Sequence, residues 1–141
     1  MHDNVVVKEK INATVEDVWK ALTDKSQMKE WYFDISDFTL EEKSQFNFYE
    51  PGGENKYHHQ GEILEVIENQ KLKHTWSYPE ISKNQTIVRW EIEKKGNGTL
   101  VTLTHKGLEN FEHLGGEFSV KSFEAGWNEL VTSSLKEYVE K

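Results

Sequence analysis

The feature that most constrains the fold is the stretch SFEAGWNELVTSSLKEYVEK at residues 122–141. Its apolar side chains recur at i, i+4, i+7, i+8, i+12 and i+15, which places them on one face of a long helix. These residues are Phe123, Trp127, Leu130, Val131, Leu135 and Tyr138. A helix with such a stripe must bury it against another element, so the rest of the chain has to supply a wide apolar surface.

The preceding residues supply that surface as a series of predicted strands. Apolar and polar side chains alternate at 5–11, 44–50, 57–67, 71–78, 86–93 and 99–105, and GNG at 96–98 is a tight hairpin signal. Two short helices are predicted, one at 12–22 with Thr14 as the N-cap. The other is at 23–32, with Thr23 or Asp24 at its start and Met28 and Trp31 facing inward. Residues 51–55 are predicted as a turn and 106–117 as a connection.

This order of elements predicts an α+β fold. We expect a curved antiparallel sheet of about six or seven strands around the long C-terminal helix, with the two short helices after the first strand. The length of 141 residues and the hydrophobic content of 35% suit one domain, residues 1–141, with one core.

Two small residues interrupt the apolar face of the final helix. Gly126 lies beside the stripe and Ser134 lies within it. A glycine inside a helix costs about 1 kcal/mol relative to alanine, so its presence requires a reason. Either the helix packs closely against a bulky strand residue such as Trp76 or Trp90, or the small residues leave space for a bound molecule.

Charge and composition exclude several classes of partner. The formal net charge is −8 and no basic run exceeds two residues, so we expect no nucleic acid as a partner. No stretch approaches the roughly 20 apolar residues of a membrane helix. We therefore expect no membrane insertion and a cytoplasmic location. The absence of cysteine removes disulfides, thiolate catalysis and cysteine-based metal sites, and no cofactor is predicted.

Four motifs, in order, resemble the domain found in homologues of the activator of the heat-shock-protein-90 ATPase. They are VEDVWKALTDKSQMKEWY, GEILEVIENQKLKHTWSY, GNGTLVTLTHKGL and AGWNEL, and together they cover nearly the whole chain. The resemblance implies the START-like, or birch-pollen-allergen-like, superfamily and its helix-grip fold. It also implies a cavity between sheet and helix that takes lipids, sterols, polyketides or similar hydrophobic molecules. The eukaryotic activator has a further N-terminal domain for which this sequence has no room, which weakens the expectation of ATPase stimulation.

The histidines offer few candidates for chemistry. His58 and His59 are adjacent in a predicted strand and so point to opposite faces. His74 and His105 alternate with apolar residues and are both predicted to point inward. Two histidines without a clustered carboxylate or cysteine make a poor zinc site. A ligand anchor, or a histidine hydrogen-bonded within the core, is the favoured interpretation.

Glu9 is the remaining candidate for an acid or base. It shares a strand face with Val5, Val7 and Ile11, where burial would raise its pKa. The favoured alternative is that Glu9 lies near solvent or pairs with Arg89 or a lysine. No arrangement typical of nucleophilic catalysis is visible, so no catalytic residue and no metal site are predicted.

The inward aromatic side chains are the strongest functional signal. Core packing explains most of them, but pockets for hydrophobic ligands are lined in the same way, and the resemblance favours a pocket. The predicted ligand-binding residues are Phe46, Phe48, His74, Trp76, Tyr78, Trp90, Leu103, His105, Phe123, Trp127, Leu130, Val131 and Ser134. We expect a binding protein for a lipid-like or aromatic small molecule. A chaperone partner and a cavity enzyme of the cyclase or hydrolase type are the alternatives.

Overall fold

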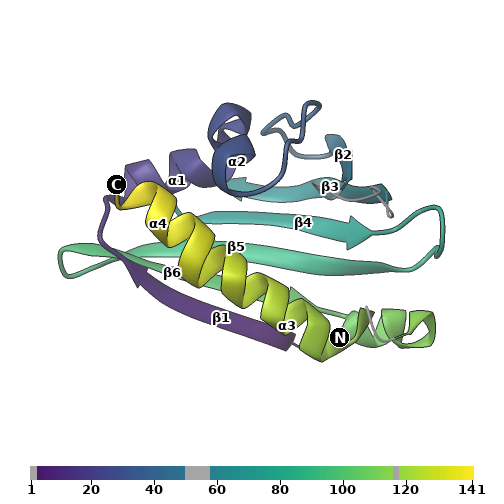
Figure 1. Ribbon diagram of the computed structural model, residues 1–141. Coiled ribbons are helices and arrows are strands. Elements are labelled where there is room, and N and C mark those ends of the chain that lie inside the picture. Colours follow the sequence, from purple (N-terminus) through teal and green to yellow (C-terminus); the bar gives the residue numbers. More distant parts are fainter. Residues whose placement is uncertain (1–2, 50–57, 116–117) are drawn as a thin grey trace.

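A computed structural model describes residues 3–49, 58–115 and 118–141. The architecture is the predicted α+β arrangement: a curved sheet, short helices after the first strand, and a long C-terminal helix lying across the sheet (Figure 1). The predicted turn at 51–55, together with Tyr57 and the end of the connection at 116–117, lies outside the described residues.

Six strands form one antiparallel sheet in the order β1-β6-β5-β4-β3-β2. They are β1 (Asp3–Ile11), β2 (Gln45–Tyr49), β3 (His58–Ile67), β4 (Lys71–Ser77), β5 (Gln85–Lys95) and β6 (Gly98–Lys106). The pairing of β3 with β4 shifts between Ile63 and Glu65, and such a bulge bends a sheet. The predicted hairpin turn is confirmed, since Lys95 pairs with Gly98 and Gly96 has a φ of 58°.

The two short helices begin where the capping residues predict. In α1 (Val15–Thr23), Thr14 Oγ1 accepts a hydrogen bond from the Asp17 amide at 3.1 Å. In α2 (Lys25–Trp31), Asp24 caps the first turn through the Ser26 amide at 3.0 Å. Both helices bury one face on the core, including Met28 and Trp31 of α2. They therefore cover one end of the sheet (Figure 1).

The C-terminal helix contains a π segment that the apolar stripe did not predict. It runs through α3 (Val120–Asn128), the π segment η3 (Glu129–Leu135) and α4 (Lys136–Val139). Trp127, Val131 and Leu135 are buried, whereas the other members of the predicted stripe are only half-buried. A π segment interrupts the 3.6-residue repeat on which the predicted stripe was based.

The connection before the final helix has a structure of its own. Residues Leu108–Leu114 form the 3-10 helix η1, which buries Leu108 and Phe111. The sequence predicted only a connection here, because a short 3-10 helix buries few residues and leaves no clear period.

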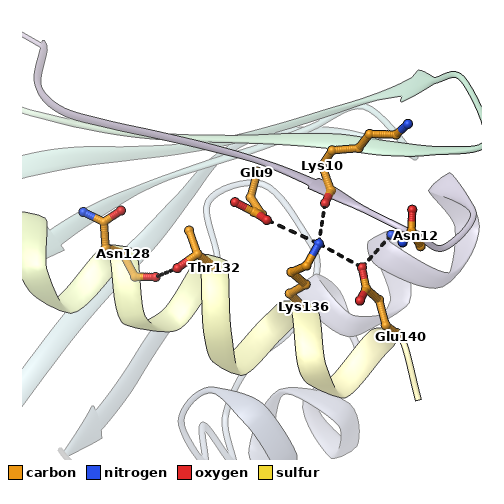
Figure 2. Close-up of polar contacts among 7 residues, drawn as sticks. All are labelled: Glu9, Lys10, Asn12, Asn128, Thr132, Lys136 and Glu140. Atoms are coloured by element: carbon orange, nitrogen blue, oxygen red, sulfur yellow. Dashed lines mark hydrogen bonds and ion pairs between the residues drawn. The ribbon is translucent and has the colours of Figure 1, made fainter.

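Lys136 anchors the end of the long helix to β1. Its Nζ lies 3.3 Å from Glu9 Oε2, 3.1 Å from Glu140 Oε2 and 2.8 Å from the Lys10 carbonyl oxygen (Figure 2). Glu140 Oε2 also accepts the Asn12 amide at 2.8 Å. Of the two interpretations of Glu9, pairing with a lysine is therefore the correct one.

Gly126 faces solvent, so both explanations offered for it are wrong. It is exposed, and a Cβ built on it meets no atom of the surrounding structure within 4 Å. Two glycines of the described sheet do pack closely: Gly98 packs on the Ile11 backbone, and Gly61 packs on a side chain of the neighbouring strand. Gly61 lies directly opposite Phe46 in the β2–β3 pairing, and a Cβ there would overlap the Phe46 ring.

Gly126 and Gly61 give opposite predictions for stability. Gly126→Ala should raise the free energy of unfolding by up to about 1 kcal/mol, because alanine is the better helix former. Gly61→Ala should lower it by roughly 1–3 kcal/mol, because the methyl group overpacks the core. Thermal and urea unfolding of the two variants check both signs, and a destabilised Gly126→Ala protein would contradict the exposed position of Gly126.

Candidate ligand-binding site

Trp127 occupies the centre of the space between helix and sheet. Its ring centroid lies 5.3 Å from that of Trp76 on β4 and 5.8 Å from that of Trp90 on β5. The ring of Tyr32, which follows α2, stacks on the Trp127 ring with 6.3 Å between the centroids. Edge-to-face packing of this kind adds to the stabilisation from burial alone. The centre of the grip is therefore filled with aromatic side chains.

A chain of buried hydrogen bonds fixes the orientation of Trp127. The indole Nε1–H can only donate, so His105 Nδ1, at 2.9 Å, must accept. The proton of the neutral imidazole is then on Nε2, which donates to Thr86 Oγ1 at 2.7 Å. The Thr86 hydroxyl in turn donates to the Trp76 carbonyl at 2.9 Å. Each of these buried polar atoms is satisfied only while His105 stays neutral.

A small cavity lies beside this centre, towards α2, and is called the inner cavity here. Its lining residues are Leu22, Met28, Trp31, Tyr32, Ile35, Phe38, Phe46, Leu72, His74 and Trp90. None of these ten residues carries a formal charge at neutral pH. The volume in which the centre of a water molecule fits is about 10 Å³, so the cavity holds roughly one water molecule.

His74 brings a polar ring into the apolar wall of the inner cavity. Its Nδ1 lies 2.8 Å from the Thr75 carbonyl oxygen. Burial lowers the pKa of His74 to about 4, and the hydrogen bond to Thr75 offsets only part of that effect. Burial also lowers the pKa of His105 to about 3, with a smaller contribution from His74. Both imidazoles are therefore neutral at physiological pH.

A second aromatic cluster lies around His59 on β3. The His59 ring stacks on Phe48 at 4.6 Å and meets Tyr78 at 4.8 Å. Trp76 contacts His59 at 5.3 Å and donates its indole hydrogen bond to the Tyr78 hydroxyl at 2.9 Å. His58 lies on the other face of the strand, where its Nε2 is 2.7 Å from Asn47 Oδ1. The prediction that the two histidines face opposite sides is thus confirmed.

The predicted ligand-binding residues are distributed over several environments. Phe46, His74 and Trp90 line the inner cavity. Leu103, His105, Trp127 and Val131 are buried at the centre, and Phe48, Trp76 and Tyr78 belong to the second cluster. Phe123 and Leu130 are half-buried. Ser134 lies outside the inner cavity, in a surface hollow with Glu30, Trp31, Glu137, Tyr138 and Lys141.

The sequence did not single out several residues of the inner cavity. Tyr32, Ile35 and Phe38 lie in the irregular segment after α2, where no period of two or 3.6 residues exists to mark them. The dense apolar spacing of WYFDISDF, residues 31–38, was the available signal. Met28 and Trp31 were predicted to face inward, but as core residues.

The described residues provide neither a metal-binding cluster nor a membrane-spanning helix. No three histidine, cysteine or acidic side chains gather there in a way that could hold a metal ion. None of the helices in the described ranges is long and apolar enough to cross a bilayer.

Comparison with known proteins places the chain in a family and confirms the helix-grip fold. The family model described as activator of Hsp90 ATPase homolog 1-like protein matches residues 12–140. None of the curated proteins matches the sequence.

Three solved structures illustrate the likeness of fold. DynU16, a protein in the dynemicin biosynthetic locus, has a TM-score of 0.79 and 22% identity over 97% of this chain and 47% of its own, so this chain spans about half of DynU16. BH1534 from Bacillus halodurans has a TM-score of 0.76 and 25% identity over 96% of both chains. The Aha1 dimer from Colwellia psychrerythraea has a TM-score of 0.72 and 21% identity, covering 96% of this chain and 95% of that one.

The buried histidines predict that stability falls in mild acid. Their pKa values in the folded protein, about 4 and about 3, lie below the value of about 6.5 in an unfolded chain. As the pH falls below 6.5 the unfolded state binds protons first, so stability present at pH 7 is lost towards the folded pKa values. For each of the two histidines, the free energy of unfolding should fall by about 2 kcal/mol between pH 7 and pH 5.

Thermal melts from pH 7 to pH 5, with imidazole NMR signals followed in parallel, check this dependence. The ring signals of His74 and His105 should stay in the neutral form through pH 5. In Trp127→Phe, which removes the donor to His105 Nδ1, the pKa of His105 should rise. A His105 ring that titrates above pH 6 in the unaltered protein would contradict the hydrogen-bond chain.

Proposed function

The chain belongs to the family of activator of Hsp90 ATPase homolog 1-like proteins, and we propose that it binds a small hydrophobic molecule in the inner cavity. The observation that carries the proposal is the uncharged lining of this cavity, contributed by α1, α2, the segment after α2 and strands β2, β4 and β5. Such a lining favours lipid-like or aromatic molecules, and one histidine among apolar walls suits a site that orients its ligand.

Binding requires the cavity to enlarge, because its present space admits only about one water molecule. The segment from Tyr32 to Leu40 is the part of the wall best suited to move. It forms no regular element, and within it the described structure gives one backbone hydrogen bond, from the Phe38 amide to the Ile35 carbonyl at 3.1 Å. Its apolar side chains attach it to the core, and Asp37 attaches it to β2 by accepting hydrogen bonds from the Asn47 backbone amide and from Asn47 Nδ2, both at 3.0 Å. A ligand could replace the apolar contacts while the segment stays attached at Asp37.

Trp31 marks the access route. It lines both the inner cavity and the surface hollow beside the C-terminal helix. Its indole donates to the Ala21 carbonyl at 2.8 Å, and its ring packs on Tyr32 at 4.8 Å and on Trp90 at 6.1 Å. Movement of the Trp31 ring with the following segment would connect the cavity to solvent.

Titration with naphthalene, followed by NMR, tests the proposal. We expect chemical-shift changes at the indole signals of Trp31 and Trp90 and at the Met28 methyl group, with smaller changes around His59. Absence of changes with naphthalene and with a fatty alcohol, or changes confined to the surface hollow, would contradict binding in the inner cavity.

Enlarging the cavity should strengthen the binding of an apolar probe. Met28→Ala removes a buried side chain from the lining, which should cost about 2–5 kcal/mol of stability and leave space for naphthalene. Leu108→Ala is the matched control, because Leu108 is equally buried but lies outside the lining. Calorimetry should show tighter naphthalene binding for Met28→Ala alone; equal affinities in the two variants would count against this cavity as the site.

A further inference from the structure

We infer that the inner cavity selects a neutral hydrophobic molecule that carries a hydroxyl group, and that this hydroxyl donates a hydrogen bond to His74 Nε2. The inference rests on the proposed function and names the chemical class of its ligand. It follows from the tautomer of His74, the donor supplied by Trp90, and the charge of the cavity wall.

The backbone fixes which nitrogen of His74 accepts. The Thr75 carbonyl oxygen can only accept, so Nδ1, at 2.8 Å, must carry the proton. A neutral imidazole then has its lone pair on Nε2. No described residue donates a hydrogen bond to Nε2, and His74 as a whole residue is only 4% exposed. Because an acceptor in an otherwise apolar wall that meets no protein donor forgoes a hydrogen bond, a ligand hydroxyl gains from meeting it.

Trp90 supplies a donor in the same cavity. It lines the cavity and is buried, and no hydrogen bond from its indole N–H to a described residue is present. In the β4–β5 pairing Leu72 lies opposite Trp90 and His74 lies opposite Val88, so His74 and Trp90 are diagonal neighbours on one face of the sheet. A hydroxyl is a small neutral group that can both donate to His74 and accept from Trp90.

The cavity wall disfavours charged and purely acceptor ligands. Its ten lining residues include no lysine or arginine, and burial keeps His74 neutral by lowering its pKa to about 4. A carboxylate would therefore be buried without a cation, which is unfavourable. An ether could accept from Trp90 but would leave Nε2 without a donor. Sites that hydrogen-bond a hydroxyl discriminate strongly against analogues that lack it.

Three probes with one ring system separate these cases: 2-naphthol, 2-methoxynaphthalene and 2-naphthoate. Binding to the full chain at pH 7 is measured by calorimetry for the unaltered protein, for His74→Phe and for His58→Phe. His58→Phe is the control, because His58 lies on the face of β3 opposite His59 and does not line the inner cavity. We expect 2-naphthol to bind about tenfold more tightly than the methyl ether, and 2-naphthoate to bind most weakly. In His74→Phe the first difference should disappear, whereas in His58→Phe it should persist.

A direct measurement avoids dependence on the folding of the variants. In the unaltered protein, the ¹⁵N signal of His74 Nε2 should move upfield on addition of 2-naphthol, because the signal of an unprotonated imidazole nitrogen moves upfield when that nitrogen accepts a hydrogen bond. The methyl ether should change this signal little. Equal affinities for 2-naphthol and its ether, or an Nε2 signal unaffected by 2-naphthol, would overturn the inference while leaving naphthalene binding and the proposed function intact. Failure of naphthalene and all three probes to bind would overturn both.

Discussion

The packing of one tryptophan determines how the C-terminal helix is arranged on the sheet. Trp127 contacts Trp76, Trp90 and Tyr32, and its only polar atom is used in the hydrogen bond to His105. Because an indole has a single donor and a neutral imidazole a single acceptor, this bond fixes the rotation of α3 over β6. At its far end the long helix is held in that position by Lys136 of α4, which bonds to Glu9 and Lys10 of β1.

Two groups of side chains adjoin this central layer, and Phe46 of one stacks on Phe48 of the other with 6.3 Å between their ring centroids. On one side, His59, Phe48 and Tyr78 form a packed cluster. On the other, the inner cavity lies under α2 and the segment that follows it. Strands β4 and β5, which contribute Leu72, His74 and Trp90 to the wall, are paired on both sides, whereas β2, which contributes Phe46, is an edge strand. We therefore expect adaptation to a ligand to be concentrated in the segment from Tyr32 to Leu40 and in the ring of Trp31.

Local sequence patterns predicted the elements but not the space they enclose. The Thr14 cap, the Gly96 turn and the alternation of His74 with Trp76 depend on neighbouring residues, and all three are as predicted. The orientation of Gly126 depends on how the helix is rotated by the bond from Trp127 to a residue 22 positions away, which no local pattern encodes. The cavity depends on Tyr32, Ile35 and Phe38, whose irregular backbone gives no period.

The central claim is that a ligand is accommodated by movement of one wall while the Trp127–His105 centre stays in place. A crystal structure of the protein with a bound hydroxylated aromatic molecule tests it most directly. The account predicts the ligand between Met28 and Trp90, the segment from Tyr32 to Leu40 displaced outward, and the hydrogen bond between Trp127 and His105 retained at its present 2.9 Å. A ligand seated where the Trp127 ring now lies, with that bond broken, would contradict it.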